Sequence, residues 1–274
     1  MKKILALIGI VIFLASCNDD TSTNPDDVDS SNSENYFATK QGSYWIYENE
    51  TENEETGTVV TKDSISLVSI SQRGGKESYN CKTSSDNDNN GSFETSNDTE
   101  TFYATAKGEL YIHKDAFLPS ELAGGGLFDL ADQIEFKSDW IKIADEGDSD
   151  WDIVESEIDI TIPGLGFNVT GDVDSEGENL NETREVNVNG KMLITYGYKV
   201  DINFNGNIGT DIFPIPFPLK FNNSTTYWIA KGIGPVIIEV GETVIESSIA
   251  ETFPGTLPNQ PGSTSTLKTY FISN

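Results

Sequence analysis

The chain has 274 residues, of which 45 are acidic and 17 basic, so its formal net charge is −28 at pH 7. A surface this negative repels nucleic acid and anionic headgroups, and we therefore exclude nucleic acid as a partner. The only two cysteines, Cys17 and Cys81, exclude the disulfide framework of small secreted domains. The length suits one large β domain or two small ones with a buried core.

The first residues are cationic and then apolar. Lys2 and Lys3 precede an apolar run from 4 to 15, which is too short to cross a hydrocarbon layer about 30 Å thick as a helix. The pattern predicts a secretory signal peptide over residues 1–16.

Leu14-Ala15-Ser16-Cys17 ends this run. It resembles the lipobox of bacterial lipoproteins. The resemblance implies cleavage between Ser16 and Cys17, a diacylglyceryl group on the Cys17 sulfur, and an acyl chain such as palmitate on the new amino terminus. More than one chain anchors stably, because each buried CH₂ contributes about 0.8 kcal/mol. The alternative is a soluble secreted protein with an incidental cysteine at its cleavage site.

An acidic tether follows over residues 17–35. Residues 18–35 contain six acidic and no basic side chains, and they carry too little apolar surface to offset the entropy cost of ordering. We expect a flexible coil spanning about 25 Å. Without Lys2 and Lys3, 15 basic residues oppose 45 acidic ones, a net charge of about −30 for the processed chain.

The residues directly after Cys17 are Asn18-Asp19-Asp20. An acidic stretch here is similar to the signal that exports lipoproteins of Bacteroidetes-type bacteria to the outer face of the outer membrane. The similarity implies an outer-membrane lipoprotein at the cell surface, with the periplasmic face as the alternative.

Residues 36–274 are predicted to form one antiparallel β domain. Glycine-containing turns at 73–76, 107–108, 189–190 and 241–242 predict hairpins. Strict alternation over 200–205 indicates one buried and one wet face, as is typical of antiparallel sheets. The predicted strands cover residues 42–48, 57–70, 77–83, 102–104, 109–113, 134–143, 151–162, 167–173, 185–189, 192–204, 227–230, 236–240, 243–246 and 267–272.

The predicted fold class is therefore all-β and mostly antiparallel: a curved meander sheet, half-barrel or sandwich. At most one short helix is expected, between residues 114 and 133. Residues 212–219 contain a proline at every second position, which excludes a central strand and favours a long loop or an edge arch.

Two short motifs are similar to a pattern in secreted and surface lipoproteins of Bacteroidetes. The early motif consists of Tyr36, Phe37, Lys40, Gly42, Trp45 and Tyr47, and the late motif of Tyr227, Trp228, Ala230, Lys231, Gly232, Gly234 and Val236. The resemblance implies a curved antiparallel sheet, a half-barrel similar to that of periplasmic lipoprotein carriers, and brings no catalytic residues. We expect these aromatics to form a core seam between the first strand and the late hairpin.

The acidic loop at 86–94 is a candidate Ca²⁺ site. Asp86, Asp88, Asn90, Ser92 and Glu94 place oxygens at alternate positions, which suits a hard cation. The twelfth position is an asparagine instead of the bidentate glutamate of such loops. An Asp/Asn-Gly hairpin loop without metal is the favoured interpretation, and we expect no other cofactor.

Nothing in the chain matches a catalytic motif, and we predict that the protein is not an enzyme. His113 is the only histidine, and its local sequence lacks the partners that a catalytic triad requires. A structural role is expected for it, and for Cys81 a place in the core beside Tyr79. A surface hydrolase is the third hypothesis.

Phe213, Ile215 and Phe217 form either a cap on the core or the apolar rim of a ligand cavity. We favour the cap. The leading functional hypothesis is a non-catalytic binding or structural module, anchored to the membrane through Cys17, whose partner is a protein, a glycan or a hydrophobic ligand. The main alternative is a carrier that holds a lipid or another hydrophobic ligand inside a half-barrel.

Overall fold

The computed structural model describes residues 35–53, 57–87, 90–117, 134–162, 167–210, 216–247 and 261–273. The signal peptide, Ser16, Cys17 and the tether up to residue 34 lie outside these ranges. All thirteen strands belong to one sheet, and every pairing is antiparallel. The predicted all-β, antiparallel fold class is therefore confirmed.

The chain contains the following elements, in order: β1 (Tyr44–Asn53), β2 (Gly57–Arg73), β3 (Lys76–Asp86), β4 (Glu94–Ala106), β5 (Glu109–His113), the 3₁₀ turn η2 (Lys114–Ala116), β6 (Trp140–Asp145), β7 (Asp150–Ile162), β8 (Phe167–Val188), β9 (Lys191–Thr210), β10 (Phe217–Ala230), β11 (Gly234–Val240), β12 (Val244–Ser247) and β13 (Ser263–Phe271). No helix within the described ranges is long and apolar enough to cross a membrane.

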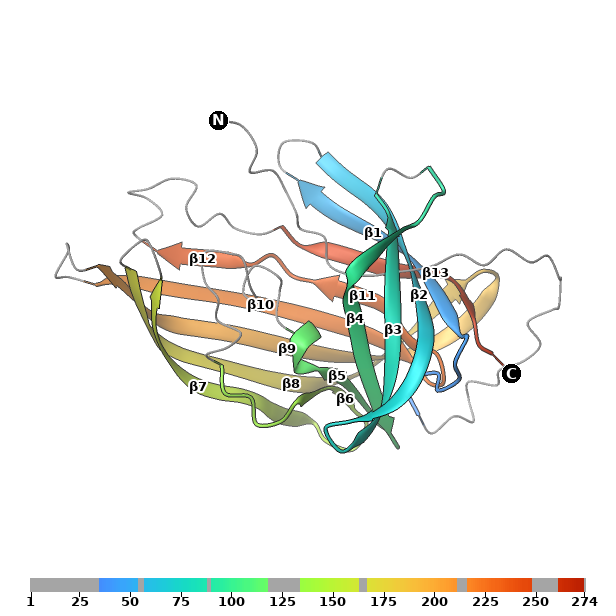
Figure 1. Ribbon diagram of the computed structural model, residues 1–274, viewed down its shortest axis with the longest axis horizontal. Helices are drawn as coiled ribbons and strands as arrows, with labels where there is room; N and C mark the ends of the chain where they lie inside the picture. The colour runs from blue at the N-terminus through green and yellow to red at the C-terminus, as the bar shows by residue number, and fades with distance from the viewer. Residues whose placement is uncertain are drawn as a thin grey trace.

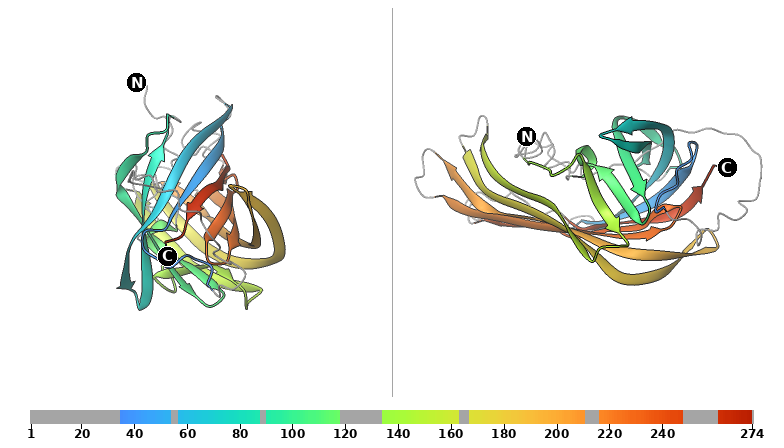
Figure 2. Two further views of the ribbon diagram at one scale, coloured as in Figure 1. Left: turned by 90° about the vertical axis from the view of Figure 1, so that its right-hand side faces the viewer. Right: turned by 90° about the horizontal axis from the view of Figure 1, so that it is seen from below.

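The sheet curls until its two edges approach each other. Its strand order is β6-β5-β4-β3-β2-β1-β13-β11-β10-β9-β8-β7, with β12 also paired to β10. Strands β1–β4 cross the long strands β7–β10 at a steep angle (Figure 1), and the curl is seen from the side in Figure 2. A single bridge between Phe136 and Val154 links the segment before β6 to β7. The curved, nearly closed sheet encloses one continuous apolar interior.

Three predicted hairpins are present. Gly74-Gly75 joins β2 to β3, Lys107-Gly108 joins β4 to β5, and Asn189-Gly190 joins β8 to β9. Asn189 and Gly190 have φ values of 50° and 84°, which is the left-handed geometry that an Asn-Gly turn supplies at low cost.

The hairpin predicted at 241–242 is wrong. β11 and β12 both pair with β10, where Val240 lies opposite Thr225 and Val244 lies opposite Asn222. They therefore continue one line along β10 with an interruption between them. The Asn223 side chain stabilises the interruption by donating to the Gly241 carbonyl and to Thr243 Oγ1.

The proline run is only partly a loop. Residues 211–215 lie outside the described ranges, but β10 begins at Phe217 and includes Pro218, opposite Asn207 of β9. The prediction of a loop through residue 219 is therefore wrong at its end. Pro218 is tolerated because it is the second residue of its strand, before β12 begins to pair at Leu219.

The two ends of the strands differ. The end that contains Asn35, the first described residue after the tether, is called the tether end here, and the opposite end the distal end. Turns at the tether end are short: two residues at 74–75, 107–108 and 189–190, three at 231–233, four at 146–149. Connections at the distal end are mostly longer, and they include residues 87–93, 117–139 and 248–262.

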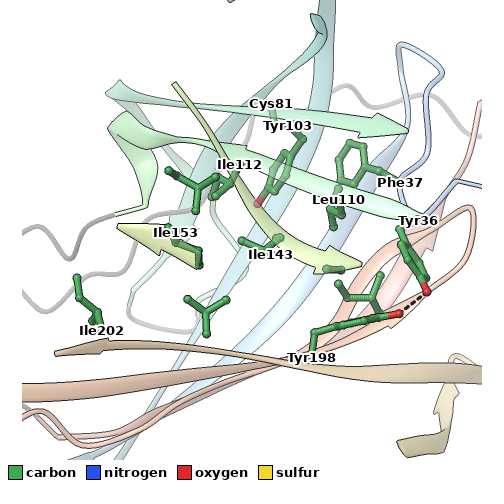
Figure 3. Close-up of a cluster of buried hydrophobic side chains, with 14 of the residues drawn as sticks. Tyr36, Phe37, Cys81, Tyr103, Leu110, Ile112, Ile143, Ile153, Tyr198 and Ile202 are labelled. Carbon is green, nitrogen blue, oxygen red and sulfur yellow. Dashed lines mark hydrogen bonds between the residues drawn. The ribbon is translucent and has the colours of Figure 1, made fainter. Parts of the chain in front are cut away.

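The residues directly after the tether fill the interior. Tyr36, Phe37 and Ala38 are 0%, 3% and 3% exposed. The Phe37 ring stacks on Trp45 and Tyr103, with centroid distances of 5.1 and 4.7 Å. Figure 3 shows this ring among interior side chains from β3, β4 and β5. The beginning of the domain is thus a plug in the core of the sheet.

Candidate functional site

The apolar inner face continues to the distal ends of the long strands. We name its members the distal apolar face: Val169, Phe204, Ile208, Phe217, Leu219 and Phe221. Phe204 and Phe221 stack at 5.4 Å between centroids. The distal halves of β7–β10 extend past the crossing strands β1–β6 in both figures. No described strand lies opposite this part of the apolar face, but Val169, Phe204, Ile208 and Leu219 are each at most 3% exposed, so the face is not open to solvent.

Phe217 is one of the three predicted rim residues, and it is partly buried against the core, opposite Ile208 of β9. Phe213 and Ile215 lie outside the described residues. The position of Phe217 fits a cap on the core, and it also borders the distal apolar face. Both interpretations of the proline run thus remain predictions.

The aromatic seam between the early and late motifs is present. Trp45 Nε1 donates to the Ile233 carbonyl oxygen at 2.9 Å, and Tyr47 donates to that of Pro235 at 2.6 Å. Gly232 N donates to the Asn35 carbonyl at 2.7 Å. The expected neighbours differ, however, because β13 pairs between β1 and β11. The motifs meet through side chains that reach past β13.

A tyrosine cluster fixes the plug at the tether end. The hydroxyls of Tyr36 and Tyr198 are hydrogen bonded to each other, and burial raises the pKa of Tyr198 to about 12. Lys231 Nζ donates to both carboxylate oxygens of Glu146 at 2.8 Å and lies 5.2 Å from the centroid of Tyr196. Such contacts hold the first residues of the domain to β9 and to the β10–β11 and β6–β7 turns.

Asp63 is an acidic side chain of the interior that the sequence analysis missed. It is 4% exposed on the face of β2 that also carries Ile65, and it accepts a hydrogen bond from Asn49. Burial raises its pKa to about 6, although hydrogen bonds from Ser85 and Asn49 oppose the shift. Its place in the alternation of β2 was the available signal, because Asp63 and Ile65 share one face.

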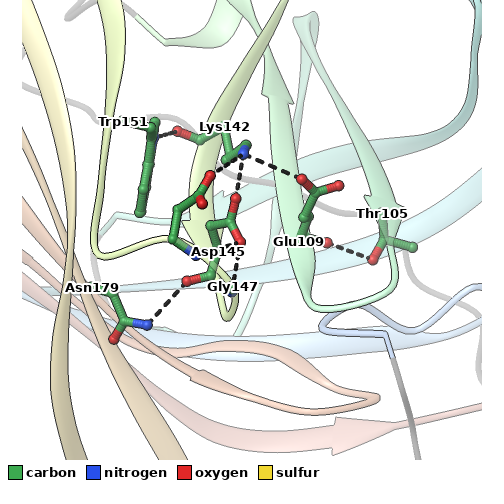
Figure 4. A network of polar contacts seen from close by, with 8 residues as sticks. Thr105, Glu109, Lys142, Asp145, Gly147, Trp151 and Asn179 are labelled. Atoms are coloured by element: carbon green, nitrogen blue, oxygen red, sulfur yellow. Dashed lines mark hydrogen bonds and ion pairs between the residues drawn. The ribbon is translucent and has the colours of Figure 1, made fainter.

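A second buried carboxylate, Asp145, lies in an ion-pair network on β5 and β6 (Figure 4). Lys142 Nζ contacts Asp145 and lies 3.2 Å from Glu109. Burial alone would raise the pKa of Asp145, but hydrogen bonds from Lys142 and from the amides of Gly147 and Asp148 outweigh it and lower that pKa. The network stabilises the β6–β7 turn, and we interpret its role as structural.

The acidic loop is only partly described, because Asp88 lies outside the described residues. Asp86 is buried, and its two carboxylate oxygens accept hydrogen bonds from the amides of Asn90 and Gly91, each at 2.9 Å. Ser92 and Glu94 are exposed. Among the described residues no three histidine, cysteine or acidic side chains are grouped to hold a metal ion. The Ca²⁺ site stays a prediction.

His113 lies outside the main core. Its ring packs edge-on against Trp140 at 5.3 Å, and its Nδ1 lies 3.1 Å from Asp115. Burial lowers its pKa. Cys81 is fully buried in the main core beside Tyr79, as predicted, and burial raises its thiol pKa. The environment of Cys81 does not favour a nucleophile, because thiolate reactivity needs a lowered pKa.

The outer face of the long strands is acidic. In the register, Glu157, Asp172 and Asn205 form one row across β7–β9, and Glu155, Asp174 and Asn203 form the next. Asn203 donates to Asp174 at 2.9 Å. The alternation thus places apolar side chains inside and carboxylates outside, which accounts for much of the negative charge of this half.

Comparison with known proteins finds a match for the amino-terminal residues of the chain. Residues 1–18 match the prokaryotic membrane lipoprotein lipid attachment site. The chain is therefore a lipoprotein whose attachment site implies membrane anchoring through lipid. No curated protein matches the chain.

Two solved structures resemble the chain weakly. One, designated a lipoprotein, is from Parabacteroides distasonis ATCC 8503; it has a TM-score of 0.43 and 11% identity, covering 86% of this chain and 97% of its own. The other, designated an exported protein with a YmcC-like fold, is from Bacteroides fragilis NCTC 9343; it has a TM-score of 0.41 and 10% identity, covering 86% and 98%.

Proposed function

We propose that this lipoprotein is a non-catalytic binding module of the outer membrane, exposed at the cell surface and anchored through Cys17. The observation that carries the proposal is the difference between the two ends of the sheet. The tether end is closed by short turns and the aromatic plug, whereas the longest connections join strand ends at the distal end. Long connections on a rigid sheet are where binding residues concentrate.

The second candidate function is a carrier of a lipid or another hydrophobic ligand. The distal apolar face favours it, because Phe204 and Phe221 belong to a stretch of inner surface that has no described strand opposite it. Ligand sites of this kind are lined mainly by apolar and aromatic side chains. A binding module that recognises a protein or glycan needs no such interior site.

Mass spectrometry of small molecules that co-purify with the full-length lipoprotein distinguishes the two functions. A carrier releases a stoichiometric hydrophobic ligand, and Phe221→Asp on the inner face reduces its yield. Asn222→Asp, one residue along β10 and exposed, is the matched control and retains the ligand. A folded wild type without any such ligand contradicts the carrier.

Protease treatment of intact cells tests the location. Surface exposure predicts that the folded domain is released or degraded while periplasmic proteins stay intact. Protection in intact cells, followed by degradation after the outer membrane is opened, would place the domain on the periplasmic face and contradict the surface assignment.

A further inference from the structure

The exposed large apolar side chains are concentrated toward the tether end. Met192 and Ile194 are the most exposed, at 54% and 57%, and they are the second and fourth residues of β9, directly after the 189–190 turn. Tyr44 begins β1 and Phe271 ends β13, also at the tether end. The distal end has Val59 and Val244. Single exposed apolar residues are ordinary, but a bias toward one end is informative.

The pair Met192 and Ile194 is joined to the exit of the tether. Alternation along β9 places Met192, Ile194 and Tyr196 on one face of the strand. Tyr196 contacts Tyr36, with ring centroids 6.3 Å apart. Tyr36 directly follows Asn35, where the tether ends. The apolar stripe therefore runs from the tether exit to the tip of the β8–β9 hairpin.

A second apolar pair lies at the same end. Tyr44 and Phe271 stack on each other, with centroids 5.7 Å apart. Ser273 N, two residues after Phe271, donates to Ser43 Oγ at 3.1 Å. Tyrosine rings, which are apolar apart from one hydroxyl, are enriched where protein meets a membrane interface.

Basic side chains are more frequent in the turns of the tether end than in the distal connections. The turns and turn-flanking residues there carry Lys40, Arg73, Lys76, Lys107, Lys191 and Lys231. Lys231 pairs with Glu146 and Arg73 with Asp115, and the β6–β7 turn at this end also carries the acidic Glu146 and Asp148. The sequences that connect the strands at the distal end contain only two lysines and no arginine, and both lysines pair with aspartates, Lys114 with Asp139 and Lys137 with Asp152. In a chain this acidic, the uneven distribution of basic residues makes the electrostatic potential less negative at the tether end than at the distal end.

We propose that the tether end is a membrane-contact surface, in which Met192 and Ile194 enter the headgroup region of the phospholipid layer that holds the Cys17 lipid. The proposal rests on lipid attachment at Cys17 and not on the identity of any ligand. Only the 18 residues from 17 to 34 separate the lipid from Asn35, so this end of the domain is the end held to the bilayer. Lysines in the turns meet lipid phosphates, while the acidic outer face is repelled.

Site-specific fluorescence on the full-length lipoprotein tests this orientation. Ile194→Cys and Val59→Cys carry a polar, environment-sensitive label, and the protein is reconstituted in vesicles of phosphatidylethanolamine with a minor fraction of phosphatidylglycerol. The native Cys81 is fully buried and the Cys17 sulfur carries lipid, so the label reacts at the introduced thiol. Val59 is the matched control because it is 42% exposed in a strand at the distal end.

Nitroxide lipids in the vesicles are expected to quench the label at position 194 and not the label at position 59. Equal quenching at both positions, no quenching at either, or stronger quenching at 59 overturns the proposal. A second reporter at Lys40→Cys leaves the apolar pair intact. Its quenching must fall in the Met192→Asp/Ile194→Asp variant and persist in Val59→Asp; unchanged quenching in the double variant, with circular dichroism showing a folded sheet, also overturns the proposal.

Discussion

Trp45 Nε1 donates a hydrogen bond to the carbonyl oxygen of Ile233 at 2.9 Å, although 188 residues separate the two in the sequence. Trp45 is 1% exposed and Ile233 is fully buried. The bond fastens the first strand to the β10–β11 turn, on the other side of β13. It therefore ties an early segment of the β domain to a late one, beside the plug.

Trp45→Phe is expected to lower the free energy of unfolding by about 2–4 kcal/mol, because it leaves the Ile233 carbonyl unpaired and the site underfilled. Chemical denaturation followed by circular dichroism measures the change. Tyr44→Phe, on the preceding and exposed residue, is the control and should change stability by less than about 0.5 kcal/mol. Similar small effects in both variants would show that the seam is energetically unimportant.

Gly206→Ala is expected to destabilise the long strands by about 2–3 kcal/mol. A Cβ atom at position 206 would lie 2.2 Å from the Thr170 carbonyl oxygen and 2.8 Å from Gly171 Cα, and both are backbone atoms of β8. Gly209→Ala on the same strand is the control, since its nearest contact is 3.9 Å. Thermal unfolding of the two variants measures the difference. Equal melting temperatures would contradict the expected destabilisation by Gly206→Ala.

Asp63 makes stability fall as the pH rises. Its pKa is about 6 in the folded protein, above its ordinary value of 3.8. A carboxyl group with a raised pKa contributes its stability fully below the unfolded pKa, and that stability is lost as the pH rises through the folded pKa. A shift of about two units corresponds to roughly 3 kcal/mol between pH 4 and pH 7.

Asp63→Asn should remove this dependence, because the amide stays neutral and its oxygen still accepts from Asn49. The variant is expected to match the wild type near pH 4 and to be the more stable protein near pH 8. Urea denaturation at a series of pH values measures both. If the free energy of unfolding of the wild type and of the variant changed with pH in parallel, ionisation of Asp63 would not destabilise the fold.

The contribution of Asp145 to stability has the opposite pH dependence. Its pKa is lowered, so its contribution is present above the unfolded pKa and is lost as the pH falls through the folded pKa. Asp145→Asn is expected to cost about 1–3 kcal/mol at pH 7 and to flatten the acid limb. Asp152→Asn is the control, since its contact with Lys137 is exposed at 3.4 Å and contributes about 0–1 kcal/mol. Equal losses in the two variants would contradict this interpretation.

Cys17 is expected to carry all of the lipid. Cells grown with radiolabelled palmitate should label the wild type and Cys81→Ser equally, whereas Cys17→Ser should take up no label and retain its signal peptide. Gel electrophoresis with autoradiography measures both results. Label in Cys17→Ser, or none in the wild type, would contradict lipid attachment at this cysteine.

Local features of the fold were predictable from the sequence. The Asn189-Gly190 turn, the Gly74-Gly75 turn and the alternation around Cys81 depend on neighbouring residues alone, and each is where the pattern placed it. The turn predicted at Gly241 failed because a glycine between two β-branched runs suits a hairpin and an interrupted strand equally. Pairing with β10 decides between them, and β10 is distant in the sequence.

The sequence by itself determined where the protein is attached and what kind of sheet it forms, because a lipid attachment site and period-two alternation are both read from adjacent residues. Only the tertiary structure decided that β13 lies between β1 and β11, that Tyr36 and Phe37 fill the interior, and that burial raises the pKa of Asp63 to about 6. Each of these depends on contacts between segments far apart in the chain, which form when the sheet curls and its inner face excludes water.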